Sequence, residues 1–88
     1  MDPYEWDDGK YAANLAKHGI PFELIAQFDW SAAAIQFDRR FDYGEDRTLA
    51  FGRIGSDGYA VVYVQRQDRV RIISLRRAHE KEMKRYGL

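Results

Sequence analysis

The sequence contains no cysteine, which excludes a disulfide framework and any metal site built on thiolates. It has two prolines and no low-complexity tract or internal repeat, so nothing in it indicates a linker between domains. No run approaches the roughly 20 consecutive apolar residues of a membrane-spanning helix, and the acidic opening is not that of a signal peptide. These absences predict one domain over residues 1–88, no membrane segment and a cytoplasmic location.

What the chain does have is a composition typical of a folded domain. Hydrophobic residues make up 45% of the 88 residues and aromatic residues 15%, enough for a small, thin core. The net charge of +0 is unevenly spread, since residues 65–88 hold 8 Lys and Arg against 3 Asp and Glu. This asymmetry indicates an anionic partner for the basic segment, or two parts of the chain that neutralise each other in the fold.

Local signals predict helices in the first third of the chain. A short strand at 4–6 is followed by a helix with Asp7 or Asp8 as N-cap and Gly19 as C-cap. Its positions Tyr11, Leu15 and His18 share one face. A second helix is predicted over 20–30, with Pro21 in its first turn. A third is predicted over 76–86.

Alternating patterns predict strands between these helices. The strands are expected over 33–40, 47–54, 59–66 and 69–75, with turns over 41–46, 55–58 and 67–68. The segment at 60–65 is apolar on both faces, as a central strand would be. The sequence therefore predicts an α+β fold: a small antiparallel β-sheet of about four strands with two N-terminal helices and one C-terminal helix.

Two adjacent arginines, Arg76 and Arg77, fall in the predicted first turn of the last helix. A cation there is unfavourable by about 0.3–1 kcal/mol, because the helix N-terminus carries a partial positive charge. An anion would explain them, and the guanidinium fork suits phosphate. Arg66, at the end of a neighbouring strand, could converge on the same site. The alternative is that these arginines pair with Asp or Glu elsewhere.

The two histidines are further candidates for chemistry at neutral pH. His18 ends the first helix beside Lys17, where it is either a proton carrier or a partner of the helix dipole. His79 is either functional or a half-exposed packing residue. No His, Asp and Glu cluster has metal-ligand spacing, so we expect neither a metal nor another cofactor.

Several motifs, in order along nearly the whole chain, resemble the BrnT family of type II toxins. The opening matches W-D-x-x-K-x-x-x-N-x-x-K-H-G at Trp6, Asp7, Lys10, Asn14, Lys17, His18 and Gly19. It is followed by Phe22, by G-E-x-R at 44–47, by R-I-I-S-x-R-x-A at 71–78 and by Tyr86. One departure is Asp29-Trp30-Ser31, where relatives commonly have D-D-P, so a loop of different shape is expected there.

The resemblance implies a RelE-like ribonuclease toxin with a small antiparallel sheet and helices on one side. It also implies neutralisation by a BrnA-type antitoxin encoded beside the toxin. Two toxins and two antitoxins would form a complex that represses its own operon. The toxin would contact DNA only through the ribbon-helix-helix portion of the antitoxin.

The implied reaction is metal-independent endoribonucleolytic cleavage by the RNA 2′-hydroxyl, which leaves a 2′,3′-cyclic phosphate and inhibits translation. It needs a base, an acid and cations around the phosphorus. Arg76, helped by Arg66 and Arg77, is expected to hold the phosphate. Lys17 and His18 are candidate proton carriers or phosphate ligands. Glu45 is a base or an orienter of an arginine, and Tyr86 either stacks on a base or closes the last helix against the sheet.

Two other function classes use the same basic C-terminal face. The chain could bind RNA without cutting it, with a steep salt dependence. It could also be a protein-interaction module whose arginines dock an acidic partner. The chemistry of RNA end groups separates these classes from a nuclease.

Overall fold

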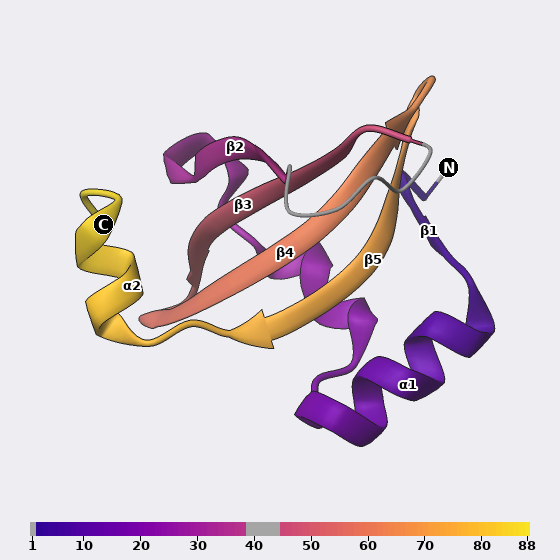
Figure 1. Ribbon diagram of the computed structural model, residues 1–88, viewed down its shortest axis with the longest axis horizontal. Helices are drawn as coiled ribbons and strands as arrows, with labels where there is room; N and C mark the ends of the chain where they lie inside the picture. Colours follow the sequence, from indigo (N-terminus) through magenta and orange to yellow (C-terminus); the bar gives the residue numbers. More distant parts are fainter. Residues whose placement is uncertain (1, 39–44) are drawn as a thin grey trace.

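The computed structural model describes residues 2–38 and 45–88, which form a five-stranded sheet flanked by short helices (Figure 1). The strands lie in the order β1-β5-β4-β3-β2. In chain order the elements are β1 (Tyr4–Trp6), α1 (Asp8–His18), the 3-10 helices η1 (Phe22–Gln27) and η2 (Trp30–Ala32), β2 (Ala34–Asp38), β3 (Arg47–Ile54), β4 (Asp57–Arg66), β5 (Arg69–Arg77) and α2 (Glu80–Arg85). The fold is therefore α+β, as predicted.

The sheet differs from the expected one in its number of strands and in their directions. The described residues form five strands rather than about four, and the sheet is mixed because β1 runs parallel to β5. Tyr4 lies opposite Val70 and Trp6 opposite Ile72. The sequence predicts the strand at 4–6 but not this pairing, which joins distant parts of the chain. The predicted extension of β2 through 39–40 and most of the turn predicted at 41–46 lie outside the described residues.

The first helix has the predicted caps, whereas the second segment is not an α-helix. The Asp7 side chain accepts from the Lys10 N–H at 3.0 Å, and Gly19, at φ 69°, ends α1. Residues 20–30 instead form η1 and the start of η2. Phe22 and Ile25 of η1 are both buried, and positions three apart align on one side of a 3-10 helix. No helix in the described ranges is long and apolar enough to span a membrane.

The last helix begins at Glu80, so the prediction of a helix from Arg76 is wrong. Arg76 and Arg77 are the final residues of β5, extended beside β4. The first turn of α2 is acidic, and the Glu82 carboxylate accepts the N–H of His79, its N-cap residue, at 3.1 Å. This arrangement suits the helix dipole. The argument from two cations at a helix N-terminus therefore does not hold.

One face of the sheet carries the main core. The central strand β4 is buried from Gly58 to Val64, which confirms the expectation of a strand covered on both faces. Its odd-numbered side chains point toward η1 and η2, and η1 lies behind the sheet in Figure 1. The buried members of this cluster are Phe22, Ile25, Phe28, Ala50, Tyr59, Val61, Tyr63, Ile72 and Leu75.

The opposite face is covered only in part, by α2. Met83 of α2 is fully buried in a second cluster with Phe51, Ala60 and Ala78. The helix approaches closely because residue 58 is glycine: a Cβ there would lie 2.6 Å from Met83 Cγ. Helical elements therefore pack on both faces, and the implied placement on one side is wrong. The remainder of this second face forms a groove beside α1.

A β-bulge in β5 sets which of its side chains reach that groove. Val62 of β4 lies opposite Ser74, but the next residue, Tyr63, lies opposite Ile72, so Ile73 is an extra residue. Ile72 and Leu75 are both fully buried in the main core, whereas Ser74 and Arg76 line the groove. Bulges are frequent beside functional sites, where they redirect side chains.

Candidate functional site

Helix α1 forms one wall of the groove and is attached to the sheet by a polar side chain. Asn14, only 4% exposed, accepts from the Leu75 N–H at 3.1 Å and donates to the Leu75 carbonyl at 2.9 Å. It thereby continues the pairing of β5 beyond the end of β1. The expected apolar face is only partly correct, because Tyr11 packs on the core while Leu15 is 44% exposed.

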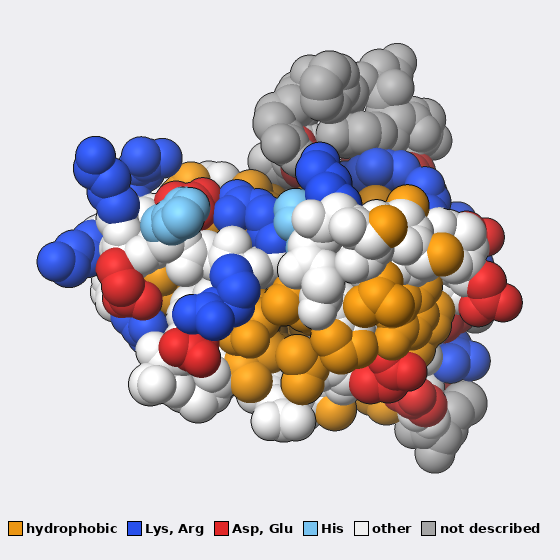
Figure 2. Space-filling model, turned by 90° about the horizontal axis from the view of Figure 1, so that it is seen from below, with side chains coloured by type: hydrophobic (Ala, Val, Ile, Leu, Met, Phe, Trp, Pro, Cys, Tyr) orange, Lys and Arg blue, Asp and Glu red, His pale blue; other side chains and the backbone are white. Residues whose placement is uncertain are grey.

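The groove has a volume of about 350 Å³ and combines a basic wall with an apolar floor. Lys10, Asn14 and Lys17 stand on the wall at i, i+4 and i+7, so they form one stripe of α1. The complete lining is Lys10, Ala13, Asn14, Lys17, His18, Leu49, Ala60, Val62, Ile73, Ser74 and Arg76. In the view from below, Lys, Arg and His side chains gather in the upper and left parts and hydrophobic ones at the lower centre (Figure 2).

Arg76 of β5 also lines the groove and is held by α2. Its Nη1 and Nη2 atoms donate to the two carboxylate oxygens of Glu82, at 3.0 and 2.9 Å. Nη1 also donates to the Arg77 carbonyl at 3.2 Å. The hydrogen bond from Arg76, together with the N–H of His79, lowers the pKa of Glu82 to about 2, although burial opposes this. Glu82 is therefore ionised at neutral pH, and Arg76 is fixed in direction.

His18 reaches the same groove from the end of α1. Its pKa is lowered from the ordinary 6.5, first by burial and then by the charges of Lys17 and Arg76. The helix C-terminus alone would favour a charged histidine, so the lowered pKa opposes the helix-dipole interpretation. At pH 7 the imidazole is neutral and can accept a proton. The groove thus combines one candidate base with several cations.

Arg77 does not share the groove with Arg76. Neighbouring residues of a strand point to opposite faces, and Arg77 extends over the face that carries the main core. It pairs with Asp57 at 3.2 Å, and its guanidinium lies 5.4 Å from the centre of the Tyr59 ring. All three arginines have the acidic partner that the alternative interpretation expected: Asp57 for Arg77, Glu82 for Arg76 and Glu45 for Arg66.

Arg66 and Glu45 lie together but far from Arg76. Arg66 is opposite Arg69 and Arg76 is opposite Ala60, so the two arginines are six residues apart along the β4–β5 ladder. At about 3.3 Å per residue this is roughly 20 Å. The prediction that they converge is wrong because β5 runs antiparallel to β4 and ends beside its start. Glu45 pairs with Arg66 at 3.4 Å and with Arg47 at 3.6 Å, and it is not among the residues that line the groove.

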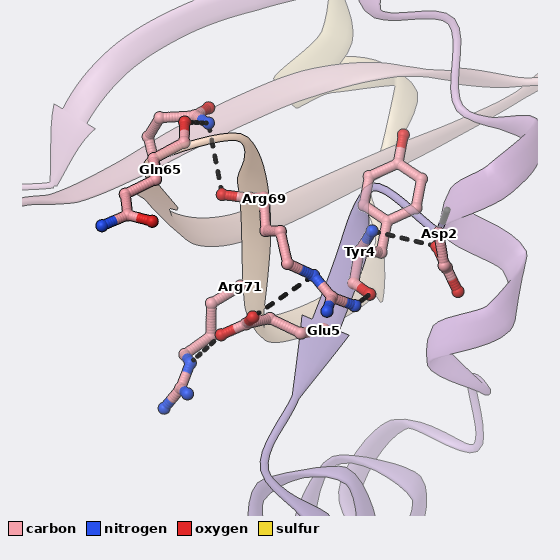
Figure 3. A network of polar contacts seen from close by, with 7 residues as sticks. Asp2, Tyr4, Glu5, Gln65, Arg69 and Arg71 are labelled. Carbon is pink, nitrogen blue, oxygen red and sulfur yellow. Dashed lines mark hydrogen bonds and ion pairs between the residues drawn. The ribbon is translucent and has the colours of Figure 1, made fainter.

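A second arginine network fastens β1 to β5 (Figure 3). Glu5 pairs with Arg71 at 2.9 Å and with Arg69 at 3.4 Å, and Arg69 also donates to the Tyr4 carbonyl at 2.8 Å. The hydrogen bond from Arg71 lowers the pKa of Glu5 below its usual range. These cations serve the parallel pairing rather than the groove.

The remaining candidates have structural positions. Tyr86 stacks on Phe51 with ring centroids 4.5 Å apart and accepts a hydrogen bond from Gln36, so it closes the end of α2 against the sheet. His79 is the exposed N-cap of α2. Among the residues that the structure describes, no three His, Asp or Glu side chains are placed to hold a metal ion.

Sequence reasoning assigned no role to several residues at the groove: Lys10, Asn14, Ser74 and Glu82. The spacing of Lys10, Asn14 and Lys17 is a helical stripe and is a usable signal. Ser74 could not be assigned to a face because of the bulge. The contact of Glu82 with Arg76 depends on how α2 packs against the sheet, and no local sequence pattern predicts that packing.

Comparison with known protein families gives a match. The family model described as "Ribonuclease toxin, BrnT, of type II toxin-antitoxin system" matches residues 6–82 of the 88-residue chain. The matched range includes every residue that lines the groove and ends at Glu82. A comparison with curated proteins gives no match. Because the family model covers most of its length, the chain belongs to the BrnT family of ribonuclease toxins of type II toxin–antitoxin systems.

Proposed function

We propose that this toxin is a RelE-like, metal-independent endoribonuclease whose reaction takes place in the groove between α1 and β5. The observation that carries the proposal is the joint position of His18 and Arg76. Both line one groove, and burial together with neighbouring charge lowers the pKa of the histidine. A neutral base beside a fixed guanidinium suits RNA cleavage by its own 2′-hydroxyl, which needs a base and positive charge near the phosphorus.

The proposed roles follow from the charges. His18 accepts the proton of the 2′-hydroxyl while the 2′-oxygen attacks the adjacent phosphorus. The bond from phosphorus to the 5′-oxygen breaks, and the ammonium of Lys17 donates a proton to that oxygen. Arg76 and Lys10 stabilise the negative charge that develops on the phosphoryl oxygens. The products are a 2′,3′-cyclic phosphate and a 5′-hydroxyl, after which solvent exchange restores the protonation states.

The first test is an end-group analysis with single-stranded RNA in EDTA. Purified toxin, freed of antitoxin, is compared with His18→Gln and Arg76→Lys. We expect fragments ending in 2′,3′-cyclic phosphate from the wild type. Loss of a general base typically lowers a rate by about 100-fold or more, so His18→Gln should cut very slowly. Arg76→Lys keeps the charge but loses the planar fork, and should also be impaired.

Arg77→Lys is the matched control because Arg77 is the neighbouring residue on the other face. It should cleave at the wild-type rate. Equal loss in Arg76→Lys and Arg77→Lys would remove the groove from the proposal. Intact RNA that the wild type nevertheless binds would indicate a binding module, or a toxin that acts only on the ribosome.

The proposal extends to the partner and the location. Family membership implies an antitoxin, and we propose that it is a BrnA-type protein encoded beside the toxin. The complex would contain two copies of each protein in the cytoplasm and would contact DNA only through the antitoxin. Co-expression followed by mass measurement in solution tests this composition, and a mass that fits one copy of each would contradict it.

A further inference from the structure

Some N–H groups of the Arg76 guanidinium bond to acceptors of the protein, and others, beside the groove, are left without an acceptor among the described residues. A guanidinium has five N–H groups in a rigid plane. Glu82 takes one each from Nη1 and Nη2, and the Arg77 carbonyl takes the other Nη1–H. No acceptor in the described ranges bonds the Nε–H or the second Nη2–H.

These two free N–H groups form a usable pair. Glu82 approaches the guanidinium end-on, so the donors left over are those along one side of the plane, which point in parallel. Two parallel N–H groups match two oxygens of one phosphate. Arg76 lines the groove and its side chain is 35% exposed, and its Nε is not among the buried nitrogen atoms without a partner in the described residues.

Glu82 is itself held in place by the helix that carries it. Its carboxylate accepts the N–H of His79, and the next residue, Met83, is fully buried beside Gly58. Its side chain is only 22% exposed. The direction of the Arg76 plane is therefore set by the docking of α2 on the sheet.

We propose that Glu82 is the positioning residue of the site, orienting Arg76 so that its Nε–H and second Nη2–H are presented to one phosphate group of RNA. This inference rests on the proposed function for its substrate and deepens it. The short C-terminal helix thereby contributes to the proposed phosphate site. Glu82 is the only residue of this helix that we place there, and it acts by orienting Arg76.

The kinetic test compares Glu82→Gln with Glu80→Gln. Both glutamates belong to α2 and both pair with an arginine, but the partner of Glu80 is Arg53, outside the groove lining. A misplacement of about 1 Å can lower a rate on the order of 100-fold. We expect Glu82→Gln to lower kcat/KM for RNA by about 10- to 100-fold, with Glu80→Gln close to wild type.

Combining each change with Arg76→Lys separates positioning from a loss of folding. If Glu82 acts through Arg76, Glu82→Gln has little further effect on kcat/KM once the guanidinium is gone. An equal loss in both backgrounds would overturn the proposal. So would a wild-type kcat/KM in Glu82→Gln.

A binding measurement makes the inference independent of catalysis. The Nε–H resonance of Arg76 is followed by NMR during titration with uridine 3′-monophosphate. It should move in the wild type and in Glu80→Gln, and move much less at the same concentrations in Glu82→Gln. An equal response in all three proteins would overturn the role of Glu82. Failure of RNA cleavage with this pattern intact would instead count against the proposed reaction.

Discussion

Asn14 of α1 bonds both the N–H and the carbonyl of Leu75 in β5, and so takes the place of a neighbouring strand. The side chain is buried, and the position it occupies lies just past the end of β1. One amide therefore closes an open stretch of sheet edge and sets how the basic wall of the groove faces its floor. Removal of the Asn14 side chain should therefore lower the stability of the fold and change the geometry of the groove.

We predict that Asn14→Ala destabilises the fold, because two backbone groups of Leu75 lose their partner. An unsatisfied buried polar group costs about 1–3 kcal/mol. Urea denaturation should show a reduced free energy of unfolding, and RNA cleavage should fall as α1 shifts. Leu15→Ala is the control on the same helix, since an exposed substitution changes stability by about 0.5 kcal/mol or less. Equal effects of the two changes would contradict the assigned role of Asn14.

Gly58→Ala should loosen α2 from the sheet. The added Cβ would lie 2.6 Å from Cγ of Met83, so one of the two must shift. Overpacking of this kind costs about 1–3 kcal/mol. The double variant with Met83→Ala tests the mechanism by urea denaturation. Its loss should be smaller than the sum of the two single losses, whereas strict additivity would show that the two residues do not clash.

Acid should weaken the fold through Glu82. Its pKa is lowered from 4.5 to about 2, so the folded state favours the ionised form. Its contribution to stability is complete above pH 4.5 and disappears as the pH falls toward 2. The urea midpoint of the wild type should therefore decline over this range, and that of Glu82→Gln should decline less. Identical pH profiles would exclude the pair with Arg76 as a source of acid sensitivity.

As a general base, His18 should give the cleavage rate an acidic limb that lies at lower pH than that of an ordinary surface histidine. Its lowered pKa leaves more than half of the imidazole neutral at pH 6.5, where an unperturbed histidine is half protonated. The rate should therefore fall as the base becomes protonated, with the midpoint of this fall below pH 6.5. The residual activity of His18→Gln should lack this acidic limb. An acidic limb with its midpoint at or above pH 6.5 would argue against His18 as the base.

The sequence predicts what is decided locally. Asp7 and Gly19 bound α1 because a cap needs only neighbouring backbone groups, and the meander from β2 to β5 follows from alternation and turns. Lys17, His18 and Arg76 were all expected at the site and do line one groove.

The predictions that are wrong concern pairing between segments that lie far apart in the sequence. Arg76 is a strand residue because β4 supplies Ala60 opposite it, which outweighs the helix-like sequence that follows. Arg66 lies far away because antiparallel strands place the end of one beside the start of the other. The parallel pairing of β1 likewise has no local signal.

The bulge at Ile73 decides which of Arg76 and Arg77 faces the groove. Without the extra residue, strict alternation from Ile72 would send Leu75 and Arg77 into the groove and turn Arg76 toward the aromatic core. One unpaired residue thus reverses which face of the sheet each later side chain of β5 points to. Arg76 and Arg77 are chemically identical. Their positions along the strand, and not their side-chain chemistry, therefore decide which one lines the groove as the proposed phosphate ligand and which one pairs with Asp57 at the surface.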